Sequence, residues 1–569
     1  MPYTSPVAEF RFLLDRVLGY AKLAETDIFA EADADTTDAI LTEIGRLCDD
    51  VMAPLNRGGD LTPAVLENGV VRTSPGFKEG YQAIAEGGWL GISASPEYGG
   101  MGLPQTLNTA MNEMMSGACL SLQLCPLLSQ GQIEALEHHA SDELKALYLP
   151  KLTSGAWTGT MNLTEPQAGS DVGALRSKAV ANGDGSYAVT GQKIFITWGD
   201  HDVAENVCHL VLARLPEGAA GTRGISLFMV PKFLPDAEGN PGARNSLRVV
   251  SLEHKLGIHG SPTCVMSFEG AKGWMVGREN GGMAAMFTMM NNARLGVGAQ
   301  GIGVAEAAYQ HALAYAKDRT QGKTPLGAGT IIDHADVRRM LAMMKAEIFA
   351  VRATALDCGL SMDRARAEGD AHWKARAALL TPIAKAHGTD IGCEVSSMGV
   401  QIHGGMGFIE ETGAAQYMRD ARITPIYEGT NGIQAMDLVG RKMADGGEAA
   451  FRLLQEVEDC AEAARSTLPD LAEPVWDSAE TLREATEWLL AQDANTRNAG
   501  AVAYLRAFAR VLGAHYHLMA AIAEPEGARA RLAKVFIDRI LPEHSSLLVQ
   551  ARAGAEQLYA LSVDDLESA

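Results

Sequence analysis

The sequence lacks several features that would place the protein in a membrane or outside the cell. No apolar run approaches the roughly 18 residues that a membrane span needs. The opening, MPYTSPVAEFRFLL, has no basic segment that leads into an apolar one, so we expect no secretory signal. The eight cysteines are scattered and include no C-x-x-C pair. We therefore expect reduced thiols, a cytoplasmic location and no membrane partner.

Positive charge is also scarce. The chain has 48 Lys and Arg against 70 Asp and Glu, which gives a formal net charge of −22. This balance argues against nucleic acid or an anionic membrane as the main partner, because both would be repelled. An anionic ligand would need a local site built from basic side chains or backbone N–H groups.

Three familiar signatures are incomplete. GVGAQG at 296–301 matches G-x-G-x-x-G, but no strand precedes it, so close helix packing is the better interpretation than a Rossmann dinucleotide site. HGGMG at 403–407 is similar to a hydrolase oxyanion loop, yet no G-x-S-x-G elbow accompanies it. Its tandem glycines instead suit a close approach of backbone to ligand. Pairs such as His138-His139 lack metal-ligand spacing, so we expect no metal site.

The 569 residues are enough for roughly three or four domain-sized units, and their pattern changes twice. Residues 1 to about 150 predict helices. Short runs rich in Val, Ile, Phe and Thr between about 155 and 275 predict a small antiparallel β unit, with LPDAEGNPGARNS as a surface loop. From about 282 onward, three- and four-residue apolar spacing predicts long helices.

The predicted fold class is α+β and mainly α. It combines a helical domain, a middle β-barrel domain, a helical bundle and an extra C-terminal helical region. The predicted boundaries are an N-terminal extension at 1–37, a helical domain at 38–157, a β domain at 158–275, a bundle at 282–445 and an additional helical domain at 446–569.

Two stretches of the β unit could bind a ligand. NLTEPQAGSDVG at 162–173 places Thr164, Gly169 and Ser170 in one loop, which could equally be an ordinary polar turn. GQKIFITWG at 191–199 places Phe195 and Thr197 on one face of a strand. There they could pack on a flat cofactor and hydrogen-bond its edge, or Phe195 could simply belong to the core.

A third candidate stretch, AYAKDRTQGKTP, ends a long predicted helix with Arg319, Gln321 and Lys323. Arg319 could bind a phosphate. It could also be a cation that the negative end of the helix dipole favours.

PIYEGTNGIQ at 425–434 contains one carboxylate, Glu428, between an apolar pair and a glycine-rich turn. Glu428 could be a solvated loop acid, a charge near the start of a helix beginning at about Asn431, or a catalytic base. An ordinary glutamate has a pKa near 4.3, and apolar walls such as Ile426 and Tyr427 would raise it. The competing acids are Glu165, Glu410 and Glu411; the last two, being adjacent, suit a surface.

These motifs occur in an order that resembles the acyl-CoA dehydrogenase family. In sequence order they are TEPQAGSD, KIFIT, NNARLGVGAQG, DRTQG, QIHGGMGF and RDARITPIYEGTNGIQ, and the resemblance covers about 40–445. The α–β–α order agrees with the family's fold. The resemblance implies FAD as cofactor, and removal of a Cα proton and a Cβ hydride from an acyl-CoA to give a trans-2-enoyl-CoA.

The resemblance also implies roles for individual positions. Glu428 matches the catalytic base. Contacts with FAD are implied for Met161, Leu163, Thr164, Gly169, Ser170, Phe195, Thr197, Arg319, Gln321, Gln401, Gly404, Gly405 and Thr430. Arg319 and Gln321 would reach the FAD of a neighbouring subunit. Substrate contacts are implied for Ser170, Arg294, Tyr427 and Gly429. Trp198 and Gly432 depart from the family pattern, in which a small or amide residue and a glutamine are common.

The resemblance implies partners as well. These are an acyl-CoA substrate, an electron-transfer flavoprotein as electron acceptor, and further copies of the chain in a homodimer or homotetramer. The extra length at both ends resembles a long subgroup of the family. Within it, the stretches AENVCHLVLARLPEGAAGTRGISLFMVPKFL and YEGTNGIQAMDLVGRK resemble members that act on 3-methylmercaptopropionyl-CoA in dimethylsulfoniopropionate breakdown, which implies that substrate. The alternatives are a fatty acyl-CoA of another chain length, an acyl-CoA oxidase, and a flavin-binding relative that acts through nucleic acid. The acidic charge and Glu428 oppose the last.

Overall fold

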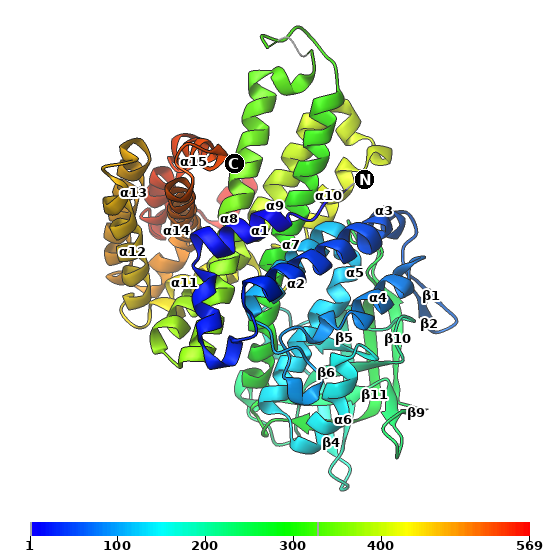
Figure 1. Ribbon diagram of the computed structural model, residues 1–569. Helices are drawn as coiled ribbons and strands as arrows, with labels where there is room; N and C mark the ends of the chain where they lie inside the picture. The colour runs from blue at the N-terminus through cyan, green and yellow to red at the C-terminus, as the bar shows by residue number, and fades with distance from the viewer. Residues whose placement is uncertain (1–2, 327–328, 569) are drawn as a thin grey trace. The chain divides into compact units, whose positions relative to one another are not determined.

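The computed structural model describes residues 3–326 and 329–568, which form two compact units (Figure 1). The first unit comprises a short N-terminal segment and residues 42–104 and 114–296. The second comprises residues 6–41 and 105–113 and the chain from 297 onward. Three helices contain the boundaries between the units: α2 (Ala34–Leu47), α5 (Gln105–His139) and α7 (Gly282–Asp318).

The first unit combines helices with a β-barrel. Besides parts of α2, α5 and α7, its helices are α3 (Ala53–Leu61), α4 (Phe77–Glu86) and α6 (Asp142–Thr153). Its strands are β1 (Val65–Glu67), β2 (Val70–Arg72), β3 (Trp157–Asn162), β4 (Lys178–Ala181), β5 (Tyr187–Thr197), β6 (Asn206–Arg214), β7 (Ile225–Pro231), β8 (Phe233–Pro235), β9 (Pro241–Arg244), β10 (Leu247–Leu252) and β11 (Thr263–Val276).

Seven of these strands form one sheet, and six of them follow the order β10-β11-β5-β4-β6-β3. Strand β7 pairs with both β11 and β6 and so closes the sheet, which confirms the predicted barrel. The prediction of a purely antiparallel unit is wrong, because β3 and β4 run parallel to β6. Between β3 and β6 the chain passes through a long loop and the strands β4 and β5. A connection of this length allows β3 and β6 to run in the same direction, because parallel strands cannot be joined by a tight turn.

Two hairpins form where the sequence predicted none. LPDAEGNPGARNS does lie at the surface, but β8 and β9 pair within and beside it, since proline and glycine are tolerated at the edge of a short ladder. In the predicted helical region, β1 and β2 pair around Asn68 and Gly69, whose φ angles are 52° and 76°. Two positive φ values in a two-residue turn are typical of type I′, which an Asn-Gly pair favours.

The barrel has apolar clusters on both of its faces. One cluster joins helical residues such as Leu136 and Tyr148 to Trp157 and Leu210 of the sheet. The other gathers side chains that include Val211 and Phe228. Because neighbouring residues of β6 enter opposite clusters, nearly the whole strand is buried and its sequence shows no polar alternation.

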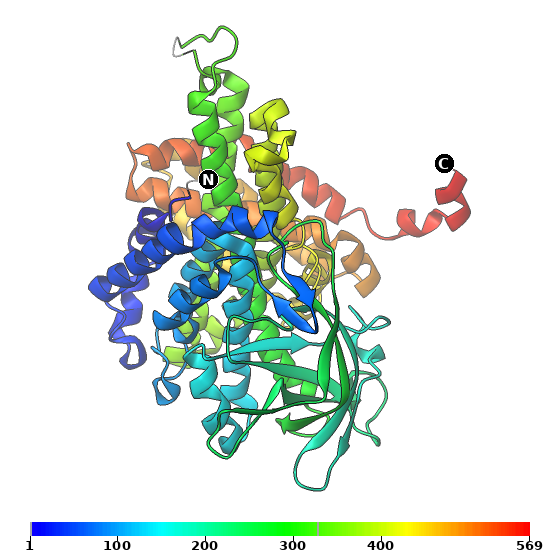
Figure 2. The ribbon, with the colours of Figure 1, turned by 90° about the vertical axis from the view of Figure 1, so that its right-hand side faces the viewer.

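In its described residues the second unit is helical, apart from an isolated bridge between Thr320 and Thr330. Besides the remaining parts of α2, α5 and α7, its principal helices are α1 (Val7–Phe12), α8 (Ala335–Glu368), α9 (Ala371–His403), α10 (Ala414–Ala421), α11 (Asn431–Val439), α12 (Glu448–Ala464), α13 (Pro469–Leu490), α14 (Ala494–Ala523), α15 (Ala528–Arg539), α16 (Glu543–Ala551), α17 (Glu556–Ala560) and α18 (Val563–Ser568). Helix α14 contacts α8, α9 and α11. Figure 2 shows α17 and α18 extending away from α12–α16.

The GVGAQG stretch lies inside α7, where its glycines meet α9. A Cβ added to Gly298 would lie 2.8 Å from the Ala384 carbonyl oxygen, and one added to Gly301 would lie 2.5 Å from that of Gly388. The two helix backbones therefore approach so closely that side chains would separate them. The interpretation of these glycines as packing residues is confirmed.

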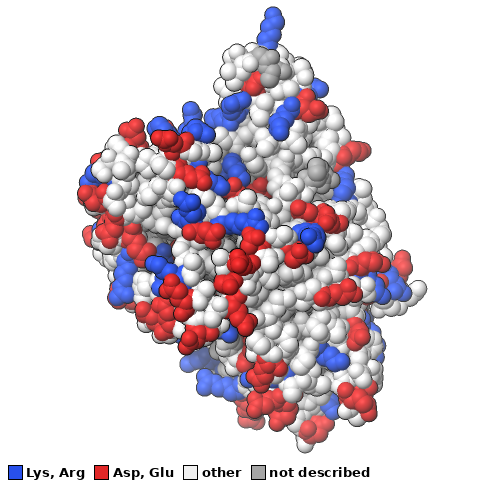
Figure 3. Space-filling view, viewed as in Figure 1, with Lys and Arg blue, Asp and Glu red and all other residues white. Residues whose placement is uncertain are grey.

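All eight cysteines are free, as the sequence predicted. Within residues 3–326 and 329–568, no helix is both long and apolar enough to cross a membrane. On the face seen in Figure 3, acidic side chains are interspersed with basic ones. This mixture agrees with a net charge that is negative without being carried by one acidic block.

Candidate active site

Glu428 lies on a tight turn between α10 and α11, in the second unit. Its φ is 54°, and Gly429 follows with φ of 83°. A glutamate adopts this left-handed conformation only where its surroundings hold it. The backbone N–H of Asn431 donates to the Pro425 carbonyl oxygen at 3.0 Å, and Gln434 Nε2 donates to the Gly429 carbonyl oxygen at 3.3 Å. The turn is thus closed by main chain and fixed by a side chain.

Helix α11 begins at Asn431, as the sequence predicted, and Thr430 is its N-cap. Thr430 Oγ1 accepts a hydrogen bond from the Ile433 N–H at 3.3 Å. The α11 N-terminus therefore orders the turn immediately after Glu428. Glu428 is half-buried. This burial excludes one of the three interpretations of its sequence, that of a fully solvated loop acid.

The two apolar neighbours of Glu428 differ. The Tyr427 hydroxyl donates to Gln300 Oε1 of α7, and burial raises the pKa of Tyr427 well above its ordinary value, so the phenol is neutral. Ile426 is 48% exposed in this chain. Tyr427 is therefore the fixed apolar neighbour of the acid, and the predicted wall at Ile426 is open to solvent in the single chain.

Glu165, the first competing acid, has a structural role in the first unit. Its carboxylate accepts from Lys193 Nζ at 2.8 Å, from Ser177 Oγ at 2.6 Å and from the Arg176 N–H at 2.7 Å. Burial alone would raise the pKa of Glu165, but Lys193 and these hydrogen bonds outweigh it and lower the pKa to about 2. Lys193 Nζ also donates to the Leu163 carbonyl oxygen at 2.9 Å. This buried pair fixes the loop that contains the predicted cofactor residues.

Replacing Glu165 by Gln should lower the stability of the protein by about 1–3 kcal/mol, because Lys193 would lose its charged partner. Stability from a carboxylate whose folded pKa is depressed is present above its unfolded pKa of 4.5 and is lost as the pH falls through about 2. The difference between wild type and variant should therefore shrink below pH 4.5. Thermal melts across pH measure it, with the exposed Glu410→Gln as control; an equal loss in both variants would contradict this account.

Phe195 is not a core residue, which excludes one of the two interpretations of its sequence. Strand β5 contains one more residue than β11 between the pairs Lys193↔Met266 and Ile196↔Cys264, which is a β-bulge. In this bulge Phe195 has φ of 59° and is 59% exposed, whereas Ile196 is buried. An exposed aromatic ring at a strained position, two residues before the half-buried Thr197, suits a flat ligand with hydrogen-bonding edges.

Trp198, a departure from the family pattern, points into the protein. It is fully buried, its Nε1 donates to the Ser121 carbonyl oxygen at 3.1 Å, and its ring stacks on Phe77. Its bulk is accommodated by the helices of the first unit. Trp198 therefore contributes to the core beside Thr197.

The remaining predicted residues fall into separate groups. In the first unit, Met161 lies in β3, and the loop after β3 carries Leu163, Thr164, Gly169 and Ser170. Arg294 is buried in α7, where it donates to Asn291 Oδ1 at 3.4 Å. In the second unit, Arg319 donates to Gln321 Oε1 at 3.4 Å at the exposed end of α7. Gln401, Gly404 and Gly405 are exposed at the end of α9, and Glu410 and Glu411 are on the surface as predicted.

Two groups of functional side chains were missed by sequence reasoning. The Glu165–Lys193 pair joins residues 28 apart, and the contacts of Asn431 reach residues more than 40 positions away. Neither spacing produces a local pattern. The one available signal was the type of residue, since a charge inside an apolar strand such as KIFIT needs a partner.

Family models of acyl-CoA dehydrogenases match four successive stretches of the chain. They are described as the N-terminal domain (38–156), the middle domain (160–271), the C-terminal domain (280–443) and "Acetyl-CoA dehydrogenase C-terminal like" (453–562). Together they account for most of the sequence. The chain belongs to the acyl-CoA dehydrogenase family.

Individual relatives agree with this assignment. A 3-methylmercaptopropionyl-CoA dehydrogenase of Ruegeria pomeroyi is 46% identical over 519 residues, which cover 89% of this chain and 88% of the relative. A butyryl-CoA dehydrogenase of Syntrophomonas wolfei and the broad-specificity linear acyl-CoA dehydrogenase FadE5 of Mycobacterium tuberculosis are each 38% identical, covering 80% of this chain and 78% of each relative.

Solved structures share the fold. Caenorhabditis elegans ACDH-11 in complex with C11-CoA has a TM-score of 0.79 at 20% identity, covering 94% of this chain and 90% of its own. Butyryl-CoA dehydrogenase from Megasphaera elsdenii has a TM-score of 0.60 at 27% identity, covering 73% of this chain and 98% of its own. The predicted combination of helical, β and helical domains with extra C-terminal helices is confirmed.

Proposed function

We propose that this protein catalyses FAD-dependent α,β-dehydrogenation of an acyl-CoA, with 3-methylmercaptopropionyl-CoA as substrate and methylthioacryloyl-CoA as product. The observation that carries the proposal is the turn at Glu428, where a half-buried carboxylate is held in a left-handed conformation by an N-capped helix and a hydrogen-bonded loop. A carboxylate fixed in this way suits proton abstraction from a weak carbon acid.

The base step follows from ordinary acid–base chemistry. The α-proton of a thioester is weakly acidic, so its removal needs a base within hydrogen-bond reach and stabilisation of the enolate oxygen. Glu428 takes the proton and becomes neutral. Tyr427, held by Gln300, limits the movement of the adjacent turn, and the family resemblance assigns the backbone N–H of Glu428 to the enolate oxygen.

The first unit carries residues that fit a flavin. Phe195 offers an exposed ring and Thr197 a hydroxyl, while Glu165 and Lys193 fix the loop that contains Thr164. FAD, when bound there, would supply the hydride acceptor for the β-hydrogen of the substrate. The role of the chain is to hold the ring and orient the hydroxyl and backbone groups at its edge.

The identity of the acyl group is supported by relatives. The Ruegeria relative of 46% identity acts, by its name, on 3-methylmercaptopropionyl-CoA, whereas relatives of 38% identity are named for butyryl-CoA and linear acyl-CoAs. A straight-chain short acyl-CoA is therefore the second candidate. Electron transfer to an electron-transfer flavoprotein and assembly into a homodimer or homotetramer, with Arg319 and Gln321 serving a neighbouring FAD, complete the proposal.

Anaerobic titration of the purified protein tests the proposal. We expect a yellow protein whose flavin absorbance bleaches on addition of 3-methylmercaptopropionyl-CoA, with kcat/KM at least tenfold above that for butyryl-CoA. Comparison of thioether and straight-chain acyl-CoAs of equal length isolates the contribution of sulfur. A colourless protein that FAD does not reconstitute would overturn the proposal, and peroxide formed without an added acceptor would indicate an oxidase.

A further inference from the structure

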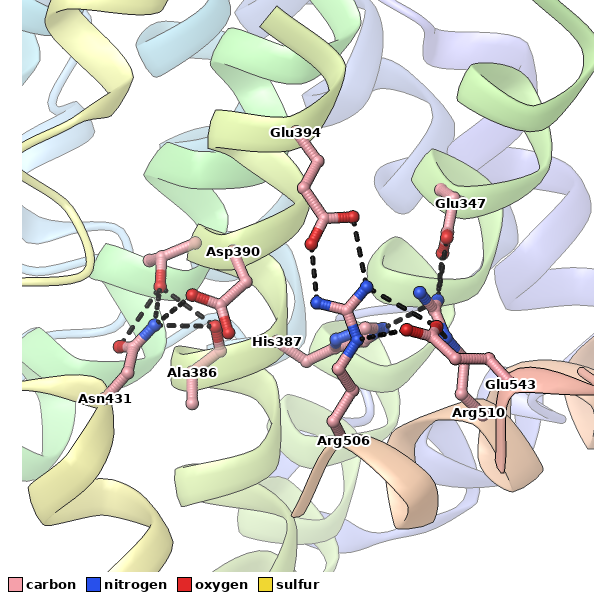
Figure 4. A network of polar contacts seen from close by, with 10 residues as sticks. Glu347, Ala386, His387, Asp390, Glu394, Asn431, Arg506, Arg510 and Glu543 are labelled. Carbon is pink, nitrogen blue, oxygen red and sulfur yellow. Dashed lines mark hydrogen bonds and ion pairs between the residues drawn. The ribbon is translucent and has the colours of Figure 1, made fainter. Parts of the chain in front are cut away.

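The side chain of Asn431 is tied to α9 by hydrogen bonds at both ends of its amide group. Its Nδ2 lies 3.0 Å from the Ala386 carbonyl oxygen, 3.0 Å from Thr389 Oγ1 and 2.7 Å from Asp390 Oδ1. Its Oδ1 accepts from Lys385 Nζ at 2.9 Å. An amide side chain offers two donors and two acceptor lone pairs, and both ends are used here. Figure 4 shows Asn431 aimed at α9.

This tie is next to the turn that carries the proposed base. Asn431 is three residues after Glu428, and its backbone N–H closes the turn on Pro425. One residue therefore closes the turn with its main chain and anchors it to α9 with its side chain. Because the left-handed conformation of Glu428 persists only while its surroundings impose it, loss of the anchor would let the carboxylate move.

The C-terminal helices hold the following turn of α9. Arg506 of α14 donates to both oxygens of Glu394, at 2.5 and 3.2 Å. Its Nε also lies 3.2 Å from Glu543 Oε1 of α16. Since Glu394 is four residues after Asp390, the two carboxylates lie on neighbouring turns of one helix face. A bidentate guanidinium–carboxylate pair fixes orientation as well as distance.

Arg510, one turn along α14, makes a second and more deeply buried connection. It is 2% exposed, its Nη1 donates to both oxygens of Glu347 on α8 at 2.7 and 2.6 Å, and its Nε donates to Glu543 at 2.7 Å. Nη1 is also 3.4 Å from His387 Nε2. Burial and the Arg510 charge lower the pKa of His387 well below its ordinary value, so the ring is neutral and Nε2 can accept. Side chains of α8, α14 and α16 are thus connected to residues 387–394 of α9.

We propose that the C-terminal helices position the base: Arg506 and Arg510 hold α9, and α9 holds the Glu428 turn through Asn431. The inference rests on the proposed function, in which Glu428 removes the α-proton. Asn431, Arg506 and Arg510 are positioning residues that act through α9. This gives the helical region after α11 a catalytic consequence, in addition to its contribution to stability.

The test compares two charge-removing variants in the C-terminal helices of the holoenzyme. Arg506→Met removes the connection to Glu394, and its partners are exposed enough to stay solvated, with side-chain exposures of 43% and 38%. Arg483→Met is the matched control, because Arg483 of α13 forms a similar bidentate pair with Glu458 of α12 rather than with a carboxylate of α9. We expect Arg506→Met to lower kcat about tenfold with KM changed less than twofold, since misplaced catalytic groups slow chemistry more than binding.

Hydrogen exchange gives a readout that needs no substrate. Amide exchange of residues 428–434 should accelerate at least tenfold in Arg506→Met and in Asn431→Ala, and should be unchanged in Arg483→Met. A folded Arg506→Met with wild-type kcat and wild-type exchange at 428–434 would overturn the inference, as would equal effects in Arg483→Met. If exchange responds as expected while no acyl-CoA bleaches any variant or the wild type, the connection stands and the proposed function fails.

Discussion

Glu428→Gln should bind FAD as the wild type does, yet be reduced by acyl-CoA at least about 10²–10⁴-fold more slowly, which is the range that a positioned general base contributes. Glutamine has nearly the same shape and keeps the backbone of the turn, including its left-handed φ. It cannot accept a proton at neutral pH, so the α-proton remains on the substrate. Stopped-flow flavin reduction under anaerobic conditions measures the step directly.

Two control variants make this result specific. Glu411→Gln removes one of the competing carboxylates from the exposed segment before α10 and should leave the reduction rate unchanged. Glu165→Gln removes another competing carboxylate, whose ion pair with Lys193 fixes the loop after β3. It should alter the stability of the protein more than the rate of flavin reduction. Reduction of Glu428→Gln at the wild-type rate would place the base elsewhere.

Some features around the candidate site follow from the sequence because their information is local. The glycines of GVGAQG are read correctly as packing residues from their helical flanks alone, and the start of α11 at Asn431 follows from a threonine before an apolar run. The hairpin around Asn68 and Gly69 was also signalled locally and was missed, since a helical prediction for the surrounding residues outweighed a two-residue turn.

The rest depends on contacts that no local pattern encodes. The bulge that exposes Phe195 is set by the register of β5 against β11, about 70 residues further along the chain. The connections of α9 to Asn431, Arg506 and Arg510 join segments that lie 41 to 123 residues apart. A sequence shows that such side chains exist; only the fold shows which of them meet.

Arg352 of α8 lies at the centre of a buried charge cluster in the second unit. It is fully buried, its Nε donates to Glu113 at 2.7 Å and its Nη2 donates to Glu306 at 2.8 Å. Burial raises the pKa of Glu113 to about 7 despite the cation beside it. The arrangement therefore balances two buried carboxylates against one guanidinium, which also lies 5.1 Å from the centre of the Phe10 ring.

Arg352→Met should destabilise the second unit by about 3–5 kcal/mol, because it leaves two carboxylates buried without a cation. Protonation would relieve part of this cost. A buried carboxyl whose folded pKa is raised contributes stability below its unfolded pKa of 4.5, which is lost as the pH rises through the folded value. The loss of unfolding free energy in Arg352→Met, measured by urea unfolding, should thus be larger at pH 8 than at pH 6.

Arg339→Met, which removes an exposed pair on the same helix, is the control and should change stability by less than about 1 kcal/mol. Adding Glu113→Gln and Glu306→Gln to Arg352→Met should recover much of the loss, since the charges then leave together; a triple variant no more stable than Arg352→Met would show that packing around the guanidinium, rather than uncompensated charge, sets the cost.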